Sequence, residues 1–271
     1  MQIKEISSSQ NSWFKSFRLL LEKNRKRKEA RKIIVEGFKE IEMAIKADIS
    51  LDYLLIEENT SEQQISQIIQ NTENLECYSL SADLFRSLTI RKTGDSILAC
   101  FSYPELNFSL EDINSNGRYI VVEGVEKPGN LGAILRTAES TGISAVIVCD
   151  AKADVFHPQV IRNSLGCSFL VNTVEAESLE VLEVLKRKGV NIFTTFMEDS
   201  EALYNCHLSS NCAIVLGTEH SGVSEIWRNQ GQNVNIPMQG EIDSMNVSIA
   251  ASIFMYESLR QRLTSSINIG N

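Results

Sequence analysis

The chain has 271 residues, and 35 acidic side chains against 26 basic ones give a formal net charge of −9. With 43% apolar residues, 14 glycines and 4 prolines, it has the composition of one large or two modest globular domains, which excludes collagen-like and low-complexity disordered classes. No apolar run approaches the roughly 18 residues of a membrane-spanning helix, and the N-terminal sequence MQIKEISSSQNSWFKS lacks the apolar core of a signal peptide. We therefore expect a cytoplasmic protein with no membrane partner. Six scattered cysteines without a CxxC pair are expected to be reduced core residues, and no metal site is expected.

Positive charge is concentrated near the N-terminus. Between Lys15 and Lys32, nine basic residues stand against two acidic ones, a local charge of +7 that leaves the rest of the chain near −16. Clustered Lys and Arg bind polyanions because each neutralised phosphate releases counterions. The stretch therefore indicates a nucleic-acid contact, and the alternative is a solvated helix face. The central candidates are Arg25, Lys26, Arg27 and Lys28.

The first part of the chain alternates short β-rich runs with helical stretches, which is typical of an α/β domain. Strands are expected at 32–35, 51–56, 77–80 and 97–101, and helices are expected from Gly37, at 61–69 and at 82–88. A polar, turn-rich segment, PELNFSLEDINSNG, follows. We therefore expect an N-terminal domain at 1–105, with the basic stretch at 15–32, a linker at 106–117 and a second domain at 118–271.

The second domain contains continuously apolar strands that alternate with helices. Strands are expected at 118–123, 145–149, 167–171, 191–196 and 212–216, and helices are expected at 131–140, 179–188 and 247–262. This pattern favours a largely parallel sheet with helices on both faces. Ligands of such sheets bind at the loops beyond the carboxyl ends of the strands. A functional site is therefore expected in those loops.

Three of these loops carry residues suited to chemistry. In EKPGNLGAILRTA, Asn130 can bring polar backbone to a ligand at a helix N-terminus, and Arg136 suits bidentate phosphate binding. In LGTEHSGV, Glu219 is better suited to ordering a loop than to contacting phosphate. In NIPMQGEIDSMNVSIA, Ser244 and Asn246 can cap the last helix or donate hydrogen bonds to a ligand. A turn, a surface charge and a helix cap are the purely structural alternatives.

The segments PGNLGAILRTAESTG, IVLGTEHSG and IPMQGEIDSMNVSIAASIFMYE resemble, in this order, the three motifs of the SpoU family within the SPOUT superfamily. HPQVIRNSLGCSFLV also resembles a family stretch that ends in Arg-x-Ser-x-Gly. KIIVEGFKEIEMAIKA is similar to the start of an RNA-binding domain that often precedes the catalytic one. The resemblance implies an α/β fold: a C-terminal domain with a deep trefoil knot, an exception to the rule that chains do not thread loops, and a small ribosomal-protein-like α/β domain before it.

The same resemblance implies an RNA 2′-O-ribose methyltransferase that uses S-adenosylmethionine and no metal. It assigns the cofactor to Gly217, Ile236, Met245, Thr195, Leu216 and Met238. The expected catalytic residues are Arg136, Asn130, Glu219, Ser244 and Asn246. Because Arg is effectively always protonated, we expect Arg136 to clamp phosphate and stabilise the developing alkoxide rather than to act as a base. Arg162 is a further candidate for RNA contact, against the alternative of a structural ion pair.

The resemblance also implies a homodimer with the active site near its interface. We expect the substrate to be ribosomal RNA of the large subunit rather than transfer RNA, and no DNA partner. One departure from the family pattern is Lys127, which stands where an acidic residue is frequent and alters the local RNA electrostatics. A noncatalytic RNA-binding or ribosome-assembly protein of the same fold is the alternative. A dinucleotide-binding oxidoreductase is disfavoured because no strand is followed by GxGxxG.

Overall fold

The computed structural model describes residues 2–61, 65–66, 68, 75–90, 95–106, 108–218, 221–242 and 244–268. It divides into two compact units. The first comprises Met1–Glu105 and Asp154–Leu170, and the second comprises Leu106–Ala153 and Val171–Asn271. Within the described ranges, every helix is too short or too polar to cross a bilayer. All six cysteines are free and buried, as expected, and burial raises the pKa of the Cys149 and Cys212 thiols to about 12.

The first unit is built on a five-stranded mixed sheet. Its strands, in spatial order, are β1 (Gln2–Ile6), β4 (Glu76–Leu80), β3 (Leu51–Glu57), β5 (Ile97–Ser102) and β2 (Lys32–Glu36). The first three run parallel, and β5 is antiparallel to both of its neighbours. Four of these strands lie within one residue of the expected bounds, and β1 was not expected.

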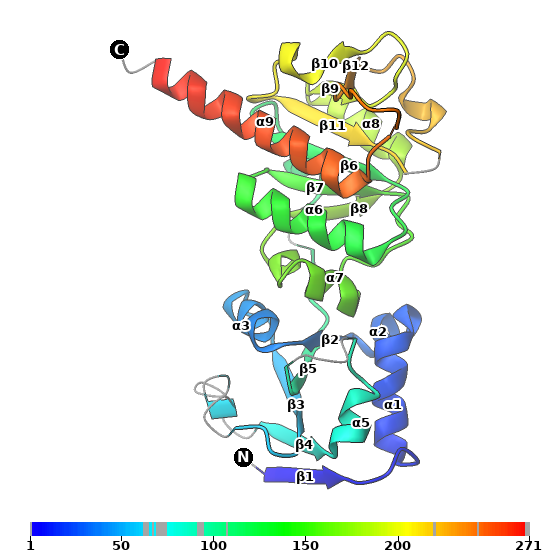
Figure 1. Cartoon of the computed structure of the whole chain (residues 1–271), viewed down its shortest axis with the longest axis vertical. Helices are drawn as coiled ribbons and strands as arrows, with labels where there is room; N and C mark the ends of the chain where they lie inside the picture. The colour runs from blue at the N-terminus through cyan, green and yellow to red at the C-terminus, as the bar shows by residue number, and fades with distance from the viewer. Residues whose placement is uncertain are drawn as a thin grey trace. The chain divides into compact units, whose positions relative to one another are not determined.

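Helices α1 (Ser12–Glu22) and α2 (Asn24–Ala30) contain most of the basic stretch, and α3 (Phe38–Lys46) and α5 (Ala82–Arg86) are further helices of this unit (Figure 1). Phe14 and Phe17 of α1 are buried against the sheet residues Ile34 and Leu55, so the apolar face of α1 forms part of the core. The helix expected at 61–69 falls largely outside the described residues.

A segment from the second half of the sequence completes the first unit. It carries α7 (Pro158–Asn163) and a 3-10 turn, η2 (Cys167–Phe169). Asp154 accepts a hydrogen bond from the buried Arg27 guanidinium at 2.9 Å and another from the Tyr103 hydroxyl at 3.2 Å. Arg162 lies 2.8 Å from Glu40, whose side chain is also buried. These ion pairs attach the segment to the first unit, whereas the expected boundary assigned it to the second domain.

Two expectations differ from the structure here. Residues 167–171 form no strand; Leu165 and Gly166 both have positive φ, at 53° and 80°, and turn the chain into the 3-10 conformation before an extended run can begin. The strand follows instead as β8 (Thr173–Ala176). Arg27 was grouped with exposed RNA-contact residues, but it is fully buried and ion-paired, so it has no surface to offer RNA.

The second unit contains a seven-stranded, wholly parallel sheet, as expected for a largely parallel one. The spatial order is β10 (Glu201–Ala202), β12 (Gln232–Asn235), β9 (Asn191–Thr194), β11 (Cys212–Leu216), β6 (Arg118–Glu123), β7 (Ala145–Cys149) and β8. Strands β6, β7 and β11 are buried along their whole length. Such strands need cover on both faces.

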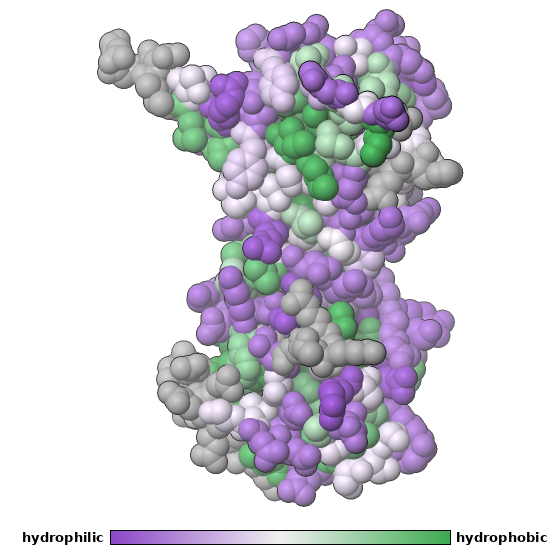
Figure 2. Space-filling view, in the orientation of Figure 1, coloured by the Kyte–Doolittle hydropathy of each residue, from purple (hydrophilic) through white to green (hydrophobic). Residues whose placement is uncertain are grey.

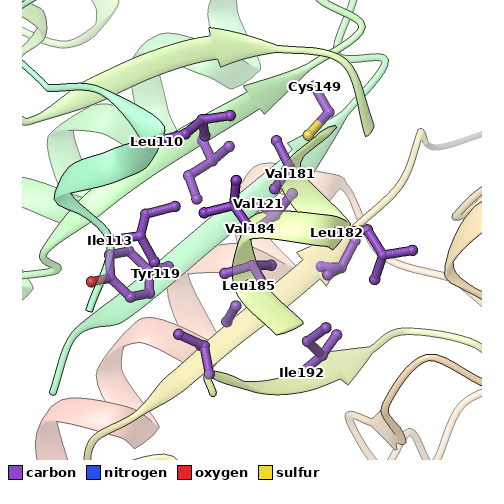
Figure 3. Packing of buried hydrophobic residues seen from close by; sticks show 14 of the residues in the cluster. Leu110, Ile113, Tyr119, Val121, Cys149, Val181, Leu182, Val184, Leu185 and Ile192 are labelled. Atoms are coloured by element: carbon purple, nitrogen blue, oxygen red, sulfur yellow. The ribbon is translucent and has the colours of Figure 1, made fainter. Parts of the chain in front are cut away.

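Helices α6 (Pro128–Thr141) and α9 (Val247–Asn268) pack together over one face of this sheet (Figure 1). Helix α8 (Ser178–Arg187) covers the other face. Its residues Val181 and Leu185 pack against Val121 and Ile192 in the cluster drawn in Figure 3. The carboxyl ends of the parallel strands, beyond this core, therefore lie at one edge, where the loops that follow them meet.

The Arg27 ion pair yields a stability prediction. Replacing Arg27 with Ala leaves the buried Asp154 carboxylate without its cation, which costs about 3–5 kcal/mol for a buried pair. We expect urea unfolding of Arg27→Ala to show a loss of this size. The neighbouring Arg25→Ala, which removes an exposed guanidinium, serves as the control and should unfold close to the wild type. Equal midpoints for the two variants would contradict the structural role of Arg27.

Candidate active site

The first cavity of interest lies at the carboxyl ends of β9, β11 and β12 and has a volume of about 280 Å³. Its wall comes from four segments that are far apart in the sequence: the ends of these strands and the beginning of α9. All six residues expected to hold the cofactor line it. These are Thr195, Leu216, Gly217, Ile236, Met238 and Met245. The lining also includes Met197, Gly222, Val234, Asn235, Ala250 and Phe254, which sequence reasoning did not single out.

The loop after β11 fixes the shape of this cavity. Thr218 and Gly222 exchange two backbone hydrogen bonds of 3.1 Å, which folds the loop back on itself. A Cβ atom at Gly217 would lie 1.9 Å from the carbonyl oxygen of Gly222. Only glycine permits this close approach, so the loop presents backbone rather than a side chain at this point.

The lining fits an adenosine-bearing cofactor. Leu216, Ile236 and Met245 provide apolar walls, and the adjoining loops provide backbone donors and acceptors, the combination common in small-molecule sites. The Thr195 hydroxyl donates to the carbonyl oxygen of Val215 at 3.1 Å, so its oxygen can still accept a hydrogen bond.

A second cavity of about 400 Å³ adjoins the first. The two share Gly217, Thr218 and Val247 as a common wall. The second cavity is otherwise lined by the end of β6, the start of α6 and the loop after β7. Its remaining lining residues are Val122, Glu123, Gly124, Val125, Glu126, Lys127, Asn130, Lys152 and Ser221. A ligand in one cavity would therefore be separated from a ligand in the other only by this wall.

Asn130 and Asn246 connect the loops around the two cavities. The Asn246 amide donates to the Asn130 side-chain oxygen at 3.2 Å, and the Asn246 side-chain oxygen accepts from the backbone N–H of Ser248 at 3.0 Å. Asn246 therefore caps α9 and also joins that helix to α6. Ser244 lines the first cavity.

Glu123, the last residue of β6, was not expected among the site residues. Its buried carboxylate accepts hydrogen bonds from the Ser178 hydroxyl at 2.6 Å, the Ser224 N–H at 2.7 Å and the Trp227 indole at 3.0 Å. These donors lie at the start of α8 and just beyond the loop after β11, so Glu123 fixes both segments to the strand end. The only sequence signal that could have identified Glu123 as a site residue is its position at the end of a continuously apolar strand.

Several other expected residues are not among the described lining of either cavity. Arg136 is exposed on α6 and is absent from the described lining of both. Glu219 lies outside the described residues. Among the RNA candidates, Arg25 and Lys28 are exposed, and Arg25 and Lys26 both pair with Glu29, at 3.2 and 2.7 Å. Arg162 makes the structural ion pair with Glu40 that was its alternative interpretation.

A parallel α/β sheet with two adjoining cavities at its strand ends defines a ligand-binding domain of the α/β enzyme class. Residues 117–256 match the SpoU rRNA methylase family, and residues 11–99 match an MRM3-like substrate binding domain. The chain belongs to the SpoU rRNA methylase family.

Individual proteins resemble the chain over nearly its whole length. The 23S rRNA (guanosine(2553)-2′-O)-methyltransferase RlmP of Bacillus subtilis (strain 168) is 28% identical over 94% of this chain and 98% of that protein. A crystal structure of an RNA 2′-O ribose methyltransferase is 34% identical, covers 96% of this chain and 100% of that one, and has a TM-score of 0.86. An AdoMet-bound rRNA methyltransferase from Sinorhizobium meliloti is 25% identical, covers 95% and 98% of the two chains, and has a TM-score of 0.83.

The close approach at Gly217 gives a testable prediction. Gly217→Ala forces the Gly222 backbone away and reshapes the first cavity, so we expect affinity for S-adenosylmethionine, the cofactor implied by the sequence motifs, to fall at least tenfold in calorimetry. Gly240→Ala is the matched control, because a Cβ there meets no atom of the described residues within 4 Å, and it should bind within twofold of the wild type. Equal cofactor affinities of Gly217→Ala and Gly240→Ala would refute the requirement for glycine at position 217.

Proposed function

We propose that this protein transfers a methyl group from S-adenosylmethionine to a ribose 2′-hydroxyl of ribosomal RNA. The observation that carries the proposal is the pair of adjoining cavities, of which the first is lined by all six residues that the motifs assign to the cofactor. Family membership and the similarity to RlmP, which is named for 23S rRNA, support ribosomal RNA of the large subunit as the substrate.

The cofactor, when bound, supplies a methyl group activated on a sulfonium. Leu216, Ile236 and Met245 exclude water from it, and the backbone of the loop after β11 holds its polar edges. The nucleophile is a hydroxyl whose pKa is far above neutral, so the developing alkoxide needs stabilisation. We assign that role and the clamping of the adjacent phosphate to the Arg136 guanidinium. Asn130 and Asn246 orient the hydroxyl, and Ser244 and Glu219 order the loops around it.

The first unit is proposed to bind the RNA substrate, while the second carries out methyl transfer. The match to an MRM3-like substrate binding domain supports this division. Lys28 on α2 is exposed and available to phosphate, and Arg25 and Lys26 become available once they leave Glu29, the exposed residue with which both pair. We propose that this activity takes place in the cytoplasm, because RlmP of Bacillus subtilis, a bacterial protein, is named for 23S rRNA.

The second unit is further proposed to contain the trefoil knot and to pair with a second copy. Ile249, Tyr256 and Leu263 recur every seven residues along α9 and are each more than half exposed. Figure 2 shows apolar surface over the region where α9 begins, and Ile242 just before the helix is 73% exposed. Burying such a row against a second copy removes apolar area from water. The exposed Arg136 on the neighbouring α6 then lies near the interface.

Sedimentation tests this dimer. Tyr256→Glu places a charge in the middle of the α9 row, and we expect it to convert a dimer into a monomer in analytical ultracentrifugation. The matched control is Leu179→Glu, which alters an equally exposed apolar side chain on α8 and should leave the dimer intact. A wild-type monomer, or a Tyr256→Glu dimer as stable as the wild type, would refute the assignment.

Methylation itself is tested with the purified full-length protein, labelled S-adenosylmethionine, and ribosomal and transfer RNA lacking their methyl groups. Nucleoside mass spectrometry should find one new 2′-O-methyl nucleotide in large-subunit RNA. Arg136→Ala should lower kcat by about 10²–10³, the effect of removing one charge-stabilising donor, and Arg187→Ala on α8 should not. Product in transfer RNA alone would overturn the substrate assignment. No product in either RNA would favour the noncatalytic alternative.

A further inference from the structure

Two lysines line the second cavity from separate elements. Lys127 immediately precedes α6, and Lys152 follows β7. The first turn of α6 contains no acidic residue, so the partial positive charge of that helix end adds to the two ammonium groups. The α6 and β7 loops thus place two cations at a cavity whose lining also contains the carboxylates of Glu123 and Glu126, and both lysines have partners within the protein.

The two carboxylates of the lining, Glu123 and Glu126, differ in how far they offset the positive charge of the two lysines. Glu123 is buried, and its carboxylate is occupied by donors from Ser178, Ser224 and Trp227. Glu126 accepts a hydrogen bond from Lys152, which lowers the pKa of the carboxyl. Both side chains of that pair are largely exposed, so the pair is weak and a more highly charged anion can displace Glu126.

The uncharged residues of the lining suit a sugar. Asn130 lies there with its amide joined to Asn246, and Gly217, Thr218 and Val247 separate this space from the first cavity. A ribose placed against this wall is next to the proposed methyl donor, and Lys127 and Lys152 line the same cavity and can bind a neighbouring phosphate.

We propose that the second cavity receives the acceptor nucleotide of the RNA and that Lys127 and Lys152 bind backbone phosphates of the acceptor strand in addition to the phosphate assigned to Arg136. The inference rests on the proposed function and deepens it by naming the cations that position the acceptor strand. Glu126 competes with phosphate for Lys152. The two lysines are positioning residues, because they contact the backbone of the substrate and not the reacting oxygen.

The test uses the full-length protein and the RNA identified by methylation mapping. We would measure the KM for RNA and kcat at several salt concentrations for Lys127→Ala, Lys152→Ala and the double variant, and cofactor affinity by calorimetry. We expect each single variant to raise the KM three- to tenfold, to reduce the salt dependence by about one phosphate contact, and to keep cofactor affinity within twofold. Lys152→Arg keeps the positive charge that Lys152→Ala removes, so its KM should equal that of the wild type.

Two further variants sharpen the result. Lys186→Ala removes an exposed ammonium from α8, outside the described lining of both cavities, and should leave the KM unchanged. Glu126→Gln frees Lys152 and should lower the KM. A double variant with the KM and salt dependence of the wild type would overturn the inference.

Failure of the proposed function has a different signature. If the wild-type protein methylates no RNA, the function is wrong, and equilibrium RNA binding of the same variants then decides the role of the cavity. Weaker binding by the double lysine variant, with Lys186→Ala unchanged, would support phosphate contacts at this position. Equal binding by all variants would overturn them.

Discussion

The carboxylate of Glu123 joins the end of β6, which lines the second cavity, to the start of α8 and to the stretch that follows the loop shared by both cavities. It lies at the end of β6, and its donors belong to the start of α8 and to the stretch that follows the loop after β11. These donors are two serines and an indole, all neutral, so hydrogen bonds compensate the cost of burying the charge. Because every bond converges on one residue, the positions of the two segments are coupled. Loss of one of these donors would therefore displace both segments and not only the segment that carries the donor.

Strand order then determines which loops meet. Strand β11 lies between β9 and β6, and β12 lies beyond β9, so the loops after four neighbouring parallel strands end at one edge. The glycine at 217 allows the loop after β11 to fold tightly within that group. The Asn130 to Asn246 contact joins the two helices that begin there. The site is thus built mainly from strand ends and helix starts, which are the most rigid places from which loops can present backbone.

Much of this arrangement could be predicted from the sequence. Buried parallel strands are continuously apolar, so the predicted bounds of β6, β7 and β11 agree with the structure at both ends. The cofactor residues were indicated by the order of the motifs and not by periodicity. Contacts between distant residues could not be predicted. Glu123 accepts a hydrogen bond from Ser224, which is 101 positions away in the sequence. In the sequence Arg27 cannot be distinguished from its basic neighbours, because its partner Asp154 is 127 positions away. The apolar run after Gly166 was interpreted as a strand because composition does not reveal the two left-handed residues before it.

The division of the chain has a consequence for biosynthesis. The first unit is discontinuous, because Asp154–Leu170 belongs to it, and a ribosome delivers residues in order. When residue 105 has emerged, the partner of the Arg27 guanidinium has not yet been made, and the nascent unit carries an uncompensated charge in its core. It can be completed only after α7 has been synthesised, by which time β6 and β7 of the second unit are also available. Completion of the first unit therefore waits until Leu170 has been synthesised, and a fragment that ends at Glu105 lacks the carboxylate that pairs with the buried Arg27.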